Sequence, residues 1–188
     1  MWSTINTSAF PDYGNLAGTW ESPELEPLSS PDGSQTFLTR AFDFDGDEWR
    51  VRFSGWADQQ RRHRLFDGVA EGQFELAGPW TTVPGAQAAI FRFTRRLFTV
   101  HNRALAQLLT QSKAGSKKWA PGVQQDVSHT GAFFVPTLSA VSAEYDLLAF
   151  DTGPNGERDL YLGDRSHEMN TPARRPVKRN PFPVRKVE

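Results

Sequence analysis

One arginine stands where the sequence pattern calls for an apolar residue. The stretch TFLTRAFDFDGDEWRVRFSG, residues 36–55, alternates apolar and polar residues on both sides of Asp45-Gly46, a dipeptide typical of two-residue β-hairpin loops. With those two residues in the loop, Arg40 pairs with Val51 and shares its face with the apolar side chains Leu38, Phe42, Trp49, Val51 and Phe53. A guanidinium stays charged, so on such a face Arg40 must meet an acid, backbone carbonyls or the head group of a ligand.

Two interpretations of Arg40 are open at this point. In the structural one it pairs with a carboxylate, and the candidates are Asp126, Glu144 and Asp146, of which Asp146 lies on a strand-like run that could reach it. In the functional one the guanidinium points into a cavity and anchors a carboxylate or carbonyl head group of a bound molecule. The ligand-binding residues would then be Arg40, Phe42, Trp49, Val51, Phe53, Phe74, Phe91 and Phe93.

The same pocket could instead be catalytic, for example in a cyclase or isomerase acting on a lipophilic intermediate of secondary metabolism. The groups available for acid–base work are Arg40, His101, Asp126, His129, Glu144 and Asp146, with His101 expected near the mouth of the pocket. Their spacing matches no catalytic motif. No metal site or cofactor is predicted, because the four histidines are scattered, cysteine is absent, and no glycine-rich nucleotide loop occurs.

The elements that must position these residues are mostly strands. Seven or eight short strands and one helix favour a mainly β fold, a curved antiparallel sheet forming a barrel or half-barrel with the helix packed on it. In residues 86–100, alternation places Ala89, Phe91, Phe93 and Leu97 on one face and Arg92, Thr94 and Arg96 on the other. The segment GAFFVPTL also reads as a strand, and Pro154-Asn155-Gly156 as a turn between the last two strands.

The helix is expected over residues 102–112. Asn102 can cap its first turn, and an apolar stripe of Leu105, Leu108 and Leu109 is expected to pack against the sheet. Near the start of the chain, Gly18-Thr19-Trp20 matches the G-x-W pattern that opens calycin barrels. Trp20 is therefore expected to be buried at one end of the barrel, with Arg158 or Arg165 over its ring.

Length and charge set the domain organisation. The 188 residues suit a single domain, predicted as an arm over residues 1–15, a barrel over 16–168 and a basic, proline-rich tail over 169–188 that could contact a partner. The net charge of −1 does not favour nucleic acid as a partner. Neither a signal peptide nor an apolar run of membrane-spanning length is evident, so a cytoplasmic location is expected.

Several blocks of the sequence carry a resemblance to a known family. The segments LAGTWES, FLTRAFDF, LFTVHNRAL, KKWAPGVQQDVS and DLYLGDRSHEMNTPARR occur in an order similar to that of the APCDD domain, found in animal membrane glycoproteins that inhibit Wnt signalling. The resemblance spans about residues 16–175. It implies an antiparallel, barrel-like domain with a lipophilic pocket, which in the animal proteins is thought to receive an acyl chain. The leading functional prediction is accordingly a lipocalin-like domain that binds a hydrophobic small molecule or acyl chain.

Overall fold

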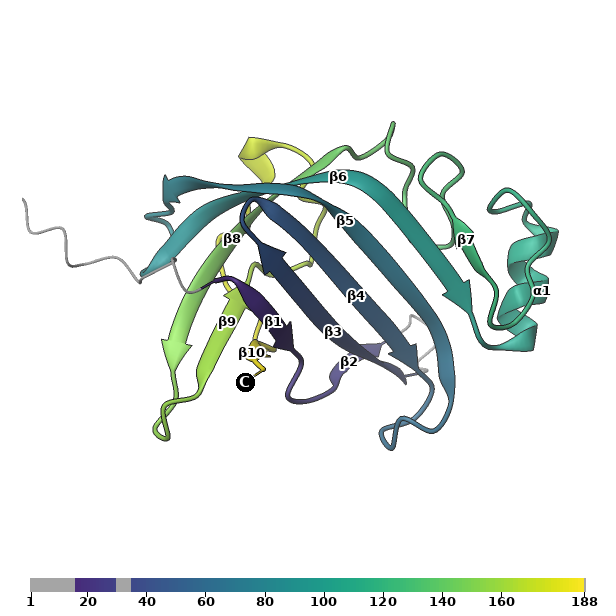
Figure 1. Ribbon diagram of the computed structural model, residues 1–188, viewed down its shortest axis with the longest axis horizontal. Helices are drawn as coiled ribbons and strands as arrows, with labels where there is room; N and C mark the ends of the chain where they lie inside the picture. Colours follow the sequence, from purple (N-terminus) through teal and green to yellow (C-terminus); the bar gives the residue numbers. More distant parts are fainter. Residues whose placement is uncertain (1–15, 30–34, 188) are drawn as a thin grey trace, which may run out of the picture.

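The computed structural model describes residues 16–29 and 35–187, so the predicted arm over residues 1–15 lies outside the described residues. One antiparallel sheet dominates the fold (Figure 1). The helix α1 covers Arg103–Gln111, and a short 3-10 turn, η2, covers Pro172–Arg174. The strands are β1 (Gly18–Glu21), β2 (Glu26–Ser29), β3 (Gln35–Asp45), β4 (Glu48–Trp56), β5 (Arg64–Pro79), β6 (Ala86–Val100), β7 (Gln124–Asp126), β8 (Ala143–Thr152), β9 (Arg158–Leu162) and β10 (Val184–Lys186).

The sheet closes into an eight-stranded barrel. Its strands follow one another in the order β1-β10-β9-β8-β6-β5-β4-β3, and β3 pairs back with β1 from Gly18↔Phe44 to Glu21↔Ala41. Strand β2 pairs with the first part of β3, and β7 pairs with the last part of β6. The predicted mainly β fold is confirmed. Of the two predicted forms, barrel and half-barrel, the structure has the closed barrel.

The first hairpin turns one residue later than predicted. Asp45 pairs with Glu48, so the loop residues are Gly46 and Asp47, and of these two only Gly46 has a positive φ, of 59°. This is the pattern of a type II′ turn, which needs glycine at the first loop position. A type I′ turn over Asp45-Gly46 would have required a positive φ at Asp45 as well.

The shifted turn changes the partners of the hairpin residues but keeps their faces. Arg40 pairs with Phe53 instead of Val51, and Val51 pairs with Phe42. The register differs from the prediction by two residues, which is one full period of side-chain alternation. Arg40 therefore still lies among the apolar side chains of β3 and β4.

A β-bulge in β6 reverses the predicted direction of the Arg96 side chain. Across β5 and β6, Glu71 pairs with Arg95 and Gly72 with Phe93, so Thr94 is the extra residue. One additional residue reverses the alternation of everything that follows it. Arg96, which simple alternation placed on the opposite face from Phe91 and Phe93, consequently points into the same interior.

Trp20 closes one end of the barrel as predicted. Its side chain is fully buried, and its indole N–H donates to the carbonyl of Leu16 at 2.7 Å. The Arg158 guanidinium lies 5.9 Å from the ring centroid, and Nζ of Lys186 lies 5.5 Å from it. The expected cationic cover over the ring is confirmed, with Arg158 as the arginine.

Helix α1 forms as predicted, and of its predicted stripe Leu105 and Leu109 pack against the core but Leu108 does not. Asn102 caps it by accepting from the amide of Leu105 at 3.0 Å. Ala106 and Leu109 are buried, whereas Leu108 is 54% exposed. The prediction for Leu108 was wrong. Adjacent residues of a helix point about 100° apart, and the face of α1 that contacts the core is too narrow to include both Leu108 and Leu109.

The segment GAFFVPTL is a turn and not a strand. Ala132 and Val135 form an isolated bridge, and Phe133 between them has a positive φ of 54°. A tight turn of this kind breaks the alternation that the apolar run suggested. Phe133 and Phe134 at its tip are both more than half exposed, while Ala132 and Val135 join the core beside α1.

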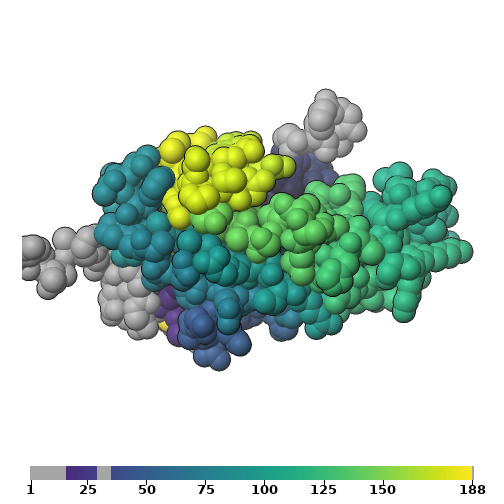
Figure 2. Space-filling model, turned by 90° about the horizontal axis from the view of Figure 1, so that it is seen from above, coloured from purple at the N-terminus to yellow at the C-terminus, as the bar shows by residue number. Residues whose placement is uncertain are grey.

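The C-terminal segment is part of the barrel and not an extension into solvent. Strand β10 lies between β9 and β1, and its Val184 is fully buried. Figure 2 shows the C-terminal residues, in yellow, lying against the body of the molecule. Arg175 places its guanidinium over the rings of Trp80 and Tyr145, and Trp80 donates to the carbonyl of Pro176 at 2.9 Å.

Within residues 16–29 and 35–187, no helix combines the length and the apolar character needed to cross a membrane.

Candidate ligand-binding site

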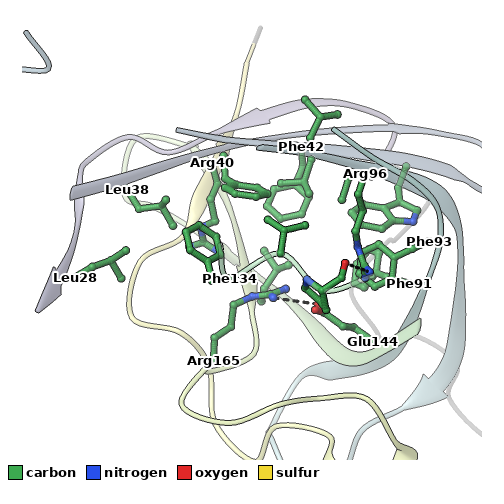
Figure 3. Close-up of a pocket in the computed structure, with 18 residues that line it drawn as sticks. Leu28, Leu38, Arg40, Phe42, Phe91, Phe93, Arg96, Phe134, Glu144 and Arg165 are labelled. Carbon is green, nitrogen blue, oxygen red and sulfur yellow. Dashed lines mark hydrogen bonds and ion pairs between the residues drawn. The ribbon is translucent and has the colours of Figure 1, made fainter. Parts of the chain in front are cut away.

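A cavity of about 340 Å³ lies inside the barrel (Figure 3). This volume falls at the lower end of the range of small-molecule pockets. Most of its walls are apolar side chains of β3, β4, β5 and β6. The lining residues are Leu28, Leu38, Arg40, Phe42, Trp49, Val51, Phe53, Val69, Ala70, Phe91, Phe93, Arg96, Phe134, Val135, Pro136, Glu144, Leu162 and Arg165.

The cavity runs from a buried floor to a partly exposed mouth. The floor is built from Phe42, Trp49 and Phe91, each 5% exposed or less. At the mouth, Leu28 is 39% exposed and Phe134 is 53% exposed. Because Leu38, Arg40 and Phe42 are alternate residues of β3, Arg40 lies part-way between mouth and floor.

Seven of the eight predicted ligand-binding residues line this one cavity. The exception is Phe74, which packs behind the wall, with its ring centroid 5.1 Å from that of Phe44 and 6.1 Å from that of Phe91. The other seven are Arg40, Phe42, Trp49, Val51, Phe53, Phe91 and Phe93. The alternation of β3, β4 and β6 was sufficient to bring them together.

Arg40 is buried and only partly satisfied. Its Nη2 donates to the carbonyl of Phe182 at 2.7 Å and lies 3.2 Å from Oε2 of Glu26, an ion pair without hydrogen-bond geometry. The predicted partners were wrong, because Asp146 is bound to Arg165 and the acid beside Arg40 comes from β2. Nε and Nη1 of Arg40 are buried and have no acceptor. Burial lowers the pKa of Arg40, and Glu26 partly offsets that effect.

A second arginine enters the cavity from the segment after β9. Arg165 donates to Oε2 of Glu144 at 3.0 Å and to Oδ2 of Asp146 at 3.3 Å. The Arg165 side chain is 40% exposed, and its partial burial acts to lower its pKa, but the carboxylates of Glu144 and Asp146 outweigh this effect and hold the pKa above its ordinary value. Figure 3 shows the Arg165 guanidinium reaching into the cavity toward Glu144, to which a dashed line joins it.

Asp146 lies behind the cavity wall. It is fully buried, and its Oδ1 accepts from the amides of Leu147 at 2.7 Å and Gly163 at 2.8 Å. Burial raises the pKa of Asp146, while Arg165 opposes that effect. These contacts tie β8 to the end of β9, so Asp146 supports the wall and orients Arg165 and does not itself line the cavity.

Arg96 is a lining residue that the sequence reasoning missed. Its Nη1 donates to the carbonyls of Pro136 at 2.8 Å and Thr137 at 3.0 Å, and its guanidinium lies 4.0 Å from the centroid of the Phe93 ring. It thereby fixes the loop that carries Phe134 over the mouth. The bulge at Thr94 that turns Arg96 inward has no clear signal in the sequence, because threonine is common in regular strands.

The remaining catalytic candidates lie elsewhere. His101 places Nε2 2.8 Å from Oδ2 of Asp67 and does not line the cavity. Asp126 binds Arg95 at 3.2 Å, and His129 is exposed. Of the candidate groups, only Arg40 and Glu144 line the cavity, and Glu144 is held by Arg165. In the described ranges no three or more histidine, cysteine or acidic side chains group as metal ligands would.

The chemistry of the cavity favours binding over reaction. Its charged groups are three guanidiniums and one carboxylate, and the carboxylate is engaged in an ion pair. Guanidiniums do not exchange protons at ordinary pH, so they orient and stabilise a ligand but do not act as bases. No protein-family model matches the sequence.

Proposed function

We propose that the protein is a lipocalin-like binding protein that holds a hydrophobic small molecule or an acyl chain inside its barrel. The observation that carries this proposal is the cavity of about 340 Å³ bounded by aromatic and aliphatic side chains. A barrel of eight strands can be filled entirely by its own side chains or can leave room for one small ligand, and here room remains. The sequence resemblance to the APCDD domain supports the same class of ligand, and membership of that family stays a prediction.

The small residues of β5 contribute to this space. Ala70 lies in the cavity wall where a larger side chain would fill it, and Gly68 leaves room for the ring of Phe53. Burial of apolar ligand surface against such walls is worth roughly 25 cal/mol per Å² before the costs of association. A flexible, apolar molecule of modest size is the ligand that this surface suits.

The test is the affinity of the protein for the neutral dye N-phenylnaphthylamine, measured by fluorescence. Val51→Phe adds bulk inside the cavity and is expected to weaken dye binding about tenfold or more. Arg52→Phe is the matched control, since it places the same ring on the opposite, exposed face of β4. It is expected to leave the affinity of the barrel unchanged.

Equal dye affinity in the wild-type protein and in Val51→Phe would contradict the proposal. Native mass spectrometry of protein purified from its own host adds a second measurement. The proposal predicts a co-purifying small molecule of low polarity in the wild-type protein, and less of it in Val51→Phe.

A further inference from the structure

We propose that the ligand is an amphiphilic carboxylic acid, whose carboxylate binds inside the barrel on Arg40 with Arg165 as a second cation. This inference rests on the proposed function, because it assumes that the cavity holds an apolar chain. It adds the chemical class of the head group and its place, part-way down the cavity and away from bulk water.

The unsatisfied donors of Arg40 are the first support. The side chain is 5% exposed, and among its nitrogens Nε and Nη1 have no acceptor. Buried donors without acceptors are rare in folded proteins, since a buried group that loses water needs a replacement partner. Arg40 lines the cavity, so a small movement of the side chains that cover these two nitrogens would let an acceptor of a ligand reach them.

The contacts that Arg40 does make leave it available. Its Nη2 is held by the carbonyl of Phe182, which fixes the guanidinium against the C-terminal segment. Glu26 lies on the same Nη2 and accepts a hydrogen bond through Oε1 from Asn180 at 3.2 Å. The guanidinium is therefore positioned by the protein but not saturated by it, which is the arrangement of a preorganised anion site.

Arg165 is the second support. It lines the same cavity, and its positive charge contributes to lowering the pKa of Arg40, so the two guanidiniums repel each other across the space. An anion placed between them would relieve this repulsion. Because the cavity wall is mostly apolar, that attraction is stronger than it would be in water.

The charges of the lining select a monoanion. Of the three guanidiniums that line the cavity, Arg165 is paired with two carboxylates, but Arg96 makes no ion pair with an acid in the described part of the chain, so the lining disfavours a cationic head group. A phosphate dianion would carry a second charge close to the carboxylate of Glu144, which lines the same cavity. A single carboxylate can accept from one of the two unsatisfied nitrogens of Arg40 without that cost.

The experiment compares dodecanoic acid, dodecanol and dodecyltrimethylammonium as competitors of N-phenylnaphthylamine at about pH 8, where the acid is ionised. The wild-type protein is expected to bind the acid about tenfold or more tightly than the alcohol, and the cation most weakly. In Arg40→Met combined with Glu26→Gln, the acid is expected to bind no better than the alcohol. Glu26→Gln alone is the control that shows whether the loss in the double variant comes from Arg40. It should keep the preference for the acid over the alcohol.

Arg50→Met is the matched control on the outside of the barrel, where Arg50 is 56% exposed and pairs with Glu71. It should keep the preference for the acid. A pH series on the wild-type protein needs no variant: acid affinity should fall as the ligand protonates at about pH 4 to 5, with dodecanol affinity constant.

Equal binding of acid and alcohol by the wild-type protein would overturn the inference and leave the proposed function standing. Loss of the preference in Arg50→Met would also overturn it, because an outer arginine would then control the head group. If none of the ligands displaces the dye from the cavity, both the proposed function and this inference fail.

Discussion

Gly68 determines how far the ring of Phe53 can retract from the cavity. A Cβ atom at position 68 would lie 1.9 Å from Cζ of Phe53, so the ring occupies the space that the missing side chain leaves. Gly68→Ala is expected to push the ring toward the cavity and to lower the free energy of unfolding by about 1–3 kcal/mol, the usual cost of overpacking. Urea denaturation measures the stability, and dye affinity should fall with it.

The double variant Gly68→Ala with Phe53→Ala separates this clash from other effects. Removing the ring should abolish the cost of the alanine at position 68, which gives a coupling energy of about 1 kcal/mol or more. Strictly additive effects of the two substitutions would show that the ring and Gly68 do not compete for the same space.

Asp126, at the end of β7, accepts hydrogen bonds from the Ser128 amide and from Arg95 and should make stability depend on pH. Hydrogen bonds from Ser128 and the neighbouring Arg95 hold the pKa of Asp126 below its ordinary value of 3.8. A carboxylate with a lowered pKa in the folded state stabilises it above its ordinary pKa, and this contribution is lost as the pH falls through the lowered value.

Asp126→Asn should therefore destabilise the protein more at about pH 6 than at about pH 3. Urea denaturation of the wild-type protein and the variant at both values measures this difference. Asp45→Asn serves as the control, since Asp45 is an exposed residue at the tip of a hairpin. A penalty that stays equal at both pH values would contradict the assignment.

At this scale the sequence identified some residues of the cavity and not others. Arg40 could be found because a charge interrupts an otherwise regular apolar face. Arg96 could not be found in this way, because its side chain points into the barrel only as a result of the bulge at Thr94. The partner of Arg40 was also out of reach, since Glu26 and the carbonyl of Phe182 are brought to it by pairings far apart in the chain.

At the scale of elements, α1 offers a comparison between neighbouring leucines. Leu109 is 2% exposed and packs beside Phe98 and Trp119 in the core next to the helix, whereas Leu108 is 54% exposed. Leu109→Ala should lower the free energy of unfolding by about 2–5 kcal/mol, and Leu108→Ala by about 0.5 kcal/mol or less. Thermal unfolding followed by circular dichroism measures both, and similar losses would show that the packing face is misassigned.

The elements themselves were largely predictable. Asn102 and the apolar period were sufficient to predict α1, and alternation predicted β3, β4 and β6. The segment at residues 132–135 was misread because four apolar residues in a row carry no period, and the turn there depends on a positive φ at Phe133. Local pattern cannot distinguish such a turn from a short buried strand.

At the scale of the whole molecule, closure of the barrel depends on its last strand. Strand β10 contacts both β1 and β9, and the segment before it supplies the carbonyl that binds Arg40. Ending the chain at Asn180 is expected to lower the melting temperature by about 10 °C or more, because it removes a central strand and the fully buried Val184. Val187→Ser, at a half-exposed position that leaves β10 in place, is the control.

A truncated chain with the melting temperature of the wild-type protein would contradict this role of β10. The sequence did not predict it, because RNPFPVRKVE contains two prolines and no alternation that extends beyond a few residues. Strand order and barrel closure follow from pairings between the two ends of the chain, and such long-range contacts leave no local signal.

The position of a bound acid tests the central claim most directly. We expect a crystal structure of the protein grown with dodecanoic acid to show the carboxylate within hydrogen-bonding distance of the Arg40 guanidinium and the chain against Phe91 and Phe93. An acid bound only on the outer surface, with the cavity still free of ligand, would contradict the account.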